Sequence, residues 1–77
     1  MTNSNKPEIS SPLSSSLMNE ARYDPFMQVM TIEFANGTIY EFIEVPKKTY
    51  SELVESESAG RYFHSQIRGK FEFLRRT

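Results

Sequence analysis

The sequence predicts an α+β domain in which a three-stranded antiparallel β-meander carries two C-terminal helices packed on one face. An Asn-Gly pair at positions 36–37 stands between two segments of alternating polarity, which is the signature of a β-hairpin. One further extended segment precedes the hairpin, and two segments with apolar residues at helical spacing follow it. A chain of 77 residues can form one such domain and is too short for a two-domain enzyme.

The composition excludes several classes of protein. With 38% hydrophobic and 13% aromatic residues, the chain is too apolar for a wholly disordered protein, and it has no apolar run long enough for a membrane span. It contains no cysteine, so it has neither a disulfide framework nor a thiolate metal site. We therefore expect a monomeric cytoplasmic domain, without a cofactor and without membrane contact.

The first thirteen residues are poor in apolar side chains and rich in Asn, Ser, Thr and Pro. Such a segment cannot bury enough surface to offset the entropy lost on ordering, and it lacks the basic start and apolar run of a signal peptide. We expect a flexible N-terminal tail at residues 1–13 and one domain at residues 14–77.

Three extended segments are expected before the helices. The first runs from Leu17 to Arg22 and ends at the turn signal Tyr23-Asp24-Pro25. The second runs from Gln28 to Phe34 and alternates apolar with polar residues, and the third covers residues 38–45. Together they predict the meander.

The length of the hairpin loop decides which way its aromatic side chains point. A three-residue loop with Gly37 in a left-handed conformation sets Ile32 opposite Tyr40 and Met30 opposite Phe42, facing the core. A two-residue loop turns both aromatic rings to the other face, where they form an exposed pair of the kind that RNA-recognition sheets stack on bases. We favour the three-residue loop because it gathers the polar side chains of both strands on one face.

The first helix is expected to begin at Pro46 or Thr49 and to end at Glu55. Proline suits a first helical turn, and Thr49 with Glu52 can form a capping box. Its apolar face consists of Tyr50, Leu53 and Val54.

The second helix is expected to follow a cap at Ser58 and to end at Gly69, a residue that readily adopts a left-handed conformation. Its apolar stripe consists of Tyr62, Phe63 and Ile67. Residues 70–75 alternate weakly and can be extended.

Several short motifs follow one another in a fixed order. They are a double Ser before the first strand, Tyr23-Asp24-Pro25, Phe34-Ala35-Asn36-Gly37, Tyr40-Glu41-Phe42, Val45-Pro46, Ser58-Ala59-Gly60-Arg61-Tyr62-Phe63 and Ile67-Arg68. Over residues 14–75 this order resembles the KTSC domain. That module of roughly 60 residues is named for its place at the C-terminus of some lysyl-tRNA synthetases, and it also occurs as a free-standing small protein in bacteria and phages.

The resemblance implies an RNA-binding role through the association with the synthetase. This sequence differs from the family's usual pattern at two positions. The central Tyr-x-Tyr of the family is Tyr40-Glu41-Phe42 here, which retains packing or stacking but not the second phenolic hydroxyl. His64 stands where the family often has Asn.

No constellation of residues predicts catalysis, so we expect a protein that is not an enzyme. The single histidine, His64, has no cysteine or second histidine with which to share a metal. Glu52, Glu55 and Glu57 are typical of a solvated helix face. The three glycines are isolated from one another, so the sequence contains no glycine-rich phosphate loop.

The charges are unevenly distributed along the chain, although the net charge is only −1. Residues 61–77 hold five basic residues and one Glu, whereas residues 41–58 hold five Glu and two Lys. Basic residues interleaved with aromatic ones suit single-stranded nucleic acid, because cations neutralise phosphates while rings stack on bases. The nucleic-acid-binding candidates are Arg61, Arg68, Lys70, Phe73, Arg75 and Arg76. The aromatic candidates, for core or stacking, are Tyr40, Phe42 and Tyr62.

Two functions fit this pattern. The leading hypothesis is a noncatalytic module that binds RNA or single-stranded nucleic acid through the basic, aromatic C-terminal segment. The alternative is a protein-protein interaction module that recruits a partner through its acidic helix or an open sheet edge. A third interpretation is purely structural: the rings fill the core, while the basic residues pair with the acidic helix and keep the domain soluble.

Overall fold

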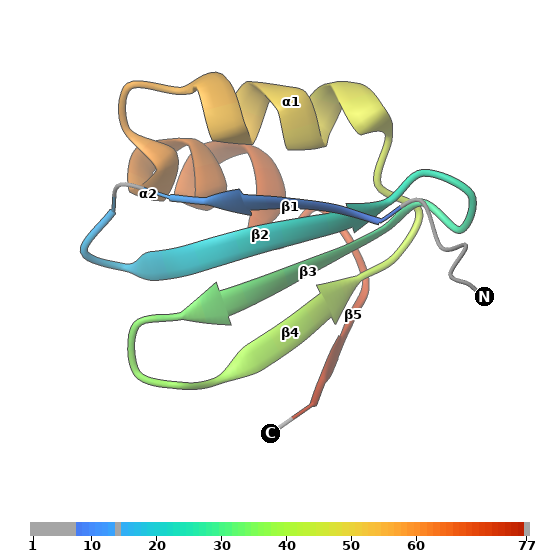
Figure 1. The fold of residues 1–77 in the computed structure, drawn as a ribbon, viewed down its shortest axis with the longest axis horizontal. Coiled ribbons are helices and arrows are strands. Elements are labelled where there is room, and N and C mark those ends of the chain that lie inside the picture. Colours follow the sequence, from blue (N-terminus) through green and yellow to red (C-terminus); the bar gives the residue numbers. More distant parts are fainter. Residues whose placement is uncertain (1–7, 14, 77) are drawn as a thin grey trace, which may run out of the picture.

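Five antiparallel strands form one sheet, and the helices cover one of its faces (Figure 1). The computed structural model describes residues 8–13 and 15–76. The strands lie in the order in which they occur in the chain: β1 (Ile9–Pro12), β2 (Met18–Asp24), β3 (Val29–Phe34), β4 (Ile39–Phe42) and β5 (Phe73–Arg75). The helical segments between β4 and β5 are α1 (Lys47–Glu55), α2 (Ala59–Tyr62) and the π-helical turn η1 (Phe63–Ile67). None of these described helices is long and apolar enough to cross a membrane.

The α+β class and the two helical regions are confirmed, but the prediction of three strands is wrong. The sheet gains β1 at one edge and β5 at the other. β1 lies inside the expected tail, so the tail cannot extend to residue 13; residues 1–7 lie outside the described part of the chain. An edge strand needs few apolar residues, because its neighbour supplies the hydrogen bonds that hold it.

β1 is held by contacts that its composition does not reveal. It pairs with β2 over four residues, with Ile9 opposite Tyr23 and Ser11 opposite Ala21. The Ser11 hydroxyl also lies 2.6 Å from the Tyr50 hydroxyl of α1. β1 therefore links the sheet to the helical layer.

Deletion of residues 1–12 is expected to destabilise the domain, because it removes the whole β1 ladder. The melting temperature should fall by more than about 5 °C, which corresponds to roughly 1 kcal/mol for a domain of this size. Thermal unfolding followed by circular dichroism measures this change, and deletion of residues 1–7, which keeps β1, is the control. Equal melting temperatures for the two deletions would show that β1 contributes nothing.

The β3–β4 hairpin has the three-residue loop that the polarity pattern favours. Gly37 has φ +93°, in the left-handed region, and its N–H donates to the Phe34 carbonyl at 2.9 Å. The Phe34 N–H in turn donates to the Thr38 carbonyl at 2.8 Å. The pairs that follow are Ile32 with Tyr40 and Met30 with Phe42. The expected register is confirmed, and it directs the aromatic rings of β4 toward the helical layer.

The helix ends agree in part with the sequence signals. Ser58 caps α2 as expected, since its side chain accepts a hydrogen bond from the Arg61 N–H at 3.3 Å. Gly69, with φ +77°, follows η1 in the expected left-handed conformation. α1 begins directly after Pro46 and has no side-chain cap, so the expected capping box at its start is not formed.

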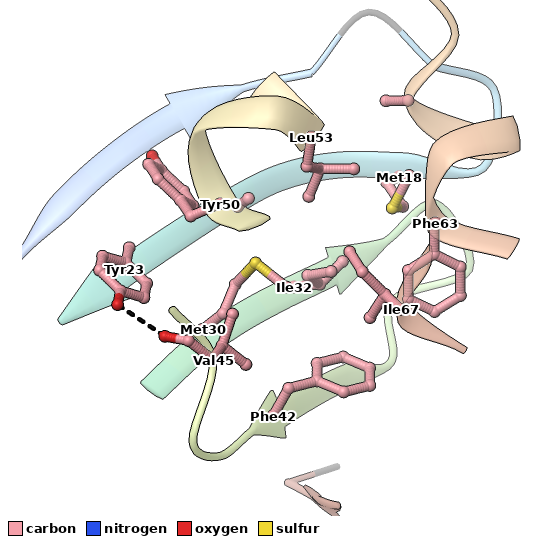
Figure 2. Packing of buried hydrophobic residues seen from close by; sticks show 12 residues of the cluster. Met18, Tyr23, Met30, Ile32, Phe42, Val45, Tyr50, Leu53, Phe63 and Ile67 are labelled. Carbon is pink, nitrogen blue, oxygen red and sulfur yellow. Dashed lines mark hydrogen bonds between the residues drawn. The ribbon is translucent and has the colours of Figure 1, made fainter. Parts of the chain in front are cut away.

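The core lies between the sheet and the helices (Figure 2). Phe63 and Ile67 are buried, as the apolar stripe predicts. The Tyr23 hydroxyl donates to the Val45 carbonyl at 2.6 Å, and burial together with the charge of Asp24 raises the pKa of Tyr23. The remaining core residues are Met18, Ala21, Met30, Ile32, Phe42, Tyr50, Leu53 and Ala59.

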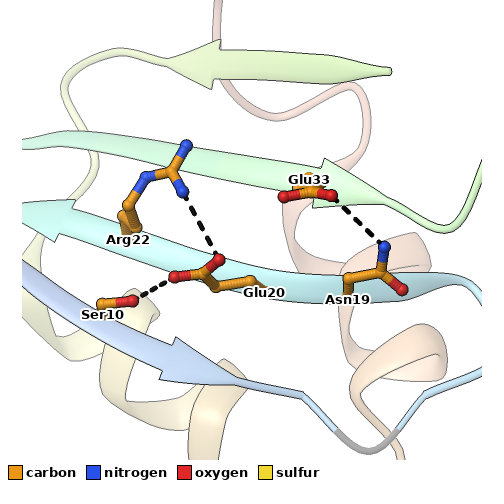
Figure 3. Close-up of polar contacts among 5 residues, drawn as sticks. All are labelled: Ser10, Asn19, Glu20, Arg22 and Glu33. Atoms are coloured by element: carbon orange, nitrogen blue, oxygen red, sulfur yellow. Dashed lines mark hydrogen bonds and ion pairs between the residues drawn. The ribbon is translucent and has the colours of Figure 1, made fainter. Parts of the chain in front are cut away.

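The helix-free face of the sheet is polar (Figure 3). On this face Arg22 lies 3.4 Å from Glu20, which also accepts a hydrogen bond from Ser10. The Asn19 amide donates to Glu33 at 3.4 Å. The hairpin register places Tyr40 and Phe42 on the opposite face, unlike the arrangement that the two-residue loop would produce.

Candidate functional site

A groove of about 730 Å³ opens between the β3–β4 hairpin, η1 and β5. It lies on the helix-covered side of the sheet, because Tyr40, Phe42 and Phe63 are among its lining residues. Its lining residues are Ser16, Leu17, Phe34, Ala35, Asn36, Thr38, Tyr40, Phe42, Phe63, His64, Arg68, Gly69 and Phe73. The groove therefore combines five aromatic rings with one histidine and one arginine.

The floor of the groove consists of rings that also belong to the core. Phe63 is only 7% exposed, and its ring meets Phe34 edge to face at 5.4 Å and Phe42 at 5.8 Å between centroids. Phe42 is 3% exposed. Edge-to-face packing of this kind fixes both rings. These two rings thus support the groove without offering a free face to a ligand.

Phe73 is the ring that the groove presents to solvent. It pairs with Phe42 across β4 and β5, and paired residues point to the same face of a sheet. Its ring lies 5.0 Å from that of Tyr40 and 5.6 Å from that of Phe42, yet the residue is 51% exposed. The exposure follows from the position of β5 at the sheet edge (Figure 1). Phe73 is therefore fixed on one side and accessible on the other.

Two cationic side chains accompany this ring. Arg68 lines the groove at the end of η1, and its Nη1 lies 3.4 Å from Nδ1 of His64. Arg75 pairs with Tyr40 across β4 and β5, so it belongs to the groove face of the sheet. Arg68 thus shares the groove lining with the exposed ring, and Arg75 lies on the same face of β5 as Phe73.

Apart from Arg68, the basic candidates lie outside the groove lining. Arg61 and Lys70 are exposed, on α2 and on the turn after η1. Arg76 lies 3.6 Å from Glu41, an ion pair on the helix-free side of the sheet. The alternation of side chains along an extended strand separates Arg76 from Arg75.

Tyr62 is also separate from the groove, because it links α2 to α1. Its hydroxyl donates to Glu52 at 2.7 Å. Burial, followed by this hydrogen bond and the charge of Glu52, raises the pKa of Tyr62 to about 12. The hydrogen bond joins α2 to α1, so the residue has a structural role at the helix contact.

Four residues of the groove lining were not among the predicted site residues: Phe34, Asn36, Thr38 and His64. The expected hairpin register could have identified Phe34, since it places this residue on the same face as Tyr40. No sequence signal places His64 in the groove lining, because its position there depends on how η1 packs. Among the described residues, no group of three or more potential metal ligands occurs.

The family is identified by its sequence pattern. The pattern of the KTSC domain matches residues 14–71. The chain belongs to the KTSC domain family. This confirms the resemblance drawn from the motifs, and the match begins and ends close to the boundaries expected for it.

Relatives of this KTSC chain include long and short proteins. It is 41% identical over 58 residues to a lysine–tRNA ligase from Trichormus variabilis. The aligned segment covers 75% of this chain and 10% of the ligase. The chain thus spans about a tenth of the length of these ligases. It is 33% identical over 60 residues to a small protein from Tsukamurella paurometabola, covering 78% of this chain and 90% of that protein.

A crystal structure shows the same fold. The KTSC domain protein from Yersinia pestis is 30% identical to this chain, with a TM-score of 0.83. The similarity covers 91% of this chain and 99% of the Yersinia protein. The α+β arrangement of antiparallel sheet and helices is therefore shared within the KTSC family.

Proposed function

We propose that this KTSC domain is a noncatalytic module that binds single-stranded RNA in the groove. One base stacks on Phe73, while Arg68 and Arg75 contact the neighbouring phosphates. The observation that carries the proposal is the half-exposed Phe73 ring, supported from behind by Tyr40 and Phe42.

The physical chemistry of single-strand binding favours this arrangement. Proteins that bind single strands combine an aromatic stacking surface with cations that follow the backbone, and each stacked base contributes about 1–3 kcal/mol. The support of Phe73 by two further rings reduces the entropy lost when a base stacks on it. An unpaired base is the favoured ligand, because bases in a duplex already stack on one another.

The distribution of charge supports the groove as the binding surface. The carboxylates of Glu20 and Glu33 lie on the helix-free face of the sheet, away from the groove (Figure 3). No carboxylate is among the residues that line the groove. An RNA backbone in the groove therefore meets the guanidinium of Arg68 without a carboxylate in the lining, and Arg75 lies on the same face of the sheet.

The relatives support RNA as the class of ligand. Lysine–tRNA ligases of Trichormus variabilis and Nostoc punctiforme contain a segment similar to this chain. Their name places that segment in enzymes that act on tRNA, an association that adds to the chemistry of the groove.

Replacing Arg68 by Gln is expected to reduce the salt dependence of RNA binding. Loss of one phosphate contact should lower the slope of log affinity against log salt by about 0.7 for a single strand. Fluorescence anisotropy with labelled oligouridine at several salt concentrations measures this slope. Arg61→Gln removes the same charge from α2, outside the groove, and should leave the slope unchanged. Equal slopes for the two variants would contradict the proposed site.

A further inference from the structure

His64 and Arg68 lie one turn apart on the same wall of the groove. Arg68 Nη1 is 3.4 Å from His64 Nδ1, and both residues are exposed at the groove. The His64 ring also meets the ring of Phe63 edge to face, with 5.7 Å between centroids. The imidazole is thus placed between the aromatic floor and the arginine.

The chemistry of this contact depends on the protonation of His64. A guanidinium group only donates hydrogen bonds, so Nδ1 must accept, which requires a neutral imidazole. A protonated imidazole has no acceptor and carries a positive charge, so it repels Arg68. Addition of a proton therefore breaks the contact and leaves two cations on one wall of the groove.

We propose that His64 is a proton-dependent phosphate ligand of the groove, so that acidification strengthens the binding of single-stranded RNA. A bound phosphate offsets the repulsion between the protonated imidazole and the guanidinium, and it accepts hydrogen bonds from both. The proton therefore binds more favourably when RNA is present, and by linkage RNA binds more tightly when the proton is present. This inference rests on the proposed function.

Besides Arg68, Glu57 is a charged group that shares a hollow with His64. It belongs to the link between α1 and α2 and lines a second, polar hollow of about 350 Å³ that His64 also borders. The groups that border this hollow from the segment before β2 are uncharged: Ser15, Ser16 and Leu17. Separate replacement of Glu57 and of His64 shows which of the two groups is the source of a change in affinity with pH.

The test is the affinity for an oligouridine of about ten nucleotides, measured between about pH 8 and pH 6 at constant ionic strength. Uracil takes up no proton in this interval, so the ligand itself does not contribute. Affinity of the intact protein should rise about fivefold as the pH falls, and the salt slope should increase by about 0.7, the equivalent of one further phosphate contact. His64→Gln should bind with the same affinity at both pH values, whereas Glu57→Gln should keep the increase.

The outcomes separate this inference from the proposed function. Equal affinity of the intact protein at both pH values would overturn the role of His64 and leave the groove as the binding site. Retention of the increase in the His64→Gln protein would overturn it as well. Absence of binding at both pH values would overturn the proposed function itself.

Discussion

Phe63→Ala should lower the free energy of unfolding by about 3–5 kcal/mol. The ring is 7% exposed and packs edge to face on Phe34 and Phe42, so its removal leaves a cavity between η1 and the sheet. A single core in a domain of this size rarely supplies more than about 3–5 kcal/mol in total. The variant should therefore be largely unfolded at 25 °C.

Urea unfolding followed by circular dichroism measures this loss. His64→Ala is the matched control, because it changes the next residue of η1, which is exposed, and should change the free energy by no more than about 0.5 kcal/mol. Strong destabilisation by the histidine change, with tolerance of Phe63→Ala, would show that η1 presents the opposite side to the sheet.

Phe73→Ala should weaken the binding of single-stranded RNA by about 1–3 kcal/mol, which is roughly fivefold to more than a hundredfold in affinity. The ring is half exposed, so its truncation should cost less stability than that of Phe63. The change therefore acts mainly on the contact with the base.

Leu74→Ala provides the matched control on the same strand. Leu74 is 59% exposed and pairs with Glu41, so it belongs to the helix-free face, whereas Phe73 belongs to the groove face. Anisotropy titrations of both variants, with circular dichroism to confirm folding, compare the two faces directly. Equal loss of affinity in the two variants would show that RNA does not distinguish the groove from the opposite face.

Local sequence signals determine the centre of this fold. The Asn36-Gly37 turn and the alternation on either side fix the hairpin register, because an error of one residue would expose the apolar face. The proline before α1, the serine cap of α2 and the left-handed glycine after η1 each set a helix end through residues adjacent in the sequence. These features depend on the chain near them, so the sequence predicts them well.

The sheet edges were predicted less well: the weak alternation of residues 70–75 indicated an extended segment, but its pairing with β4 and the whole of β1 were not expected. β1 contains only one strongly apolar residue, Ile9, and depends on hydrogen bonds to β2 and on the contact between Ser11 and Tyr50. β5 has three residues, and its place beside β4 depends on how the helices return the chain. Both strands form through partners distant in the sequence.

The candidate site was predictable in its chemistry but not in its geometry. The basic and aromatic composition of the C-terminal segment draws attention to its candidate residues, and both Arg68 and Phe73 line the groove. Arg75 and Arg76 are neighbours in the sequence, yet the alternation of β5 places them on opposite faces. The groove depends on the packing of η1 against the hairpin, which also brings in His64.

The central claim is that this KTSC domain binds single-stranded RNA, and titration of the intact protein with labelled oligouridine at two ionic strengths tests it most directly. We expect saturable binding at about 50 mM salt and weaker binding at about 200 mM, because Arg68 and Arg75 displace counterions from the phosphates. Two phosphate contacts correspond to a slope of about −1.4 in log affinity against log salt. Absence of binding at the lower salt concentration would contradict the account.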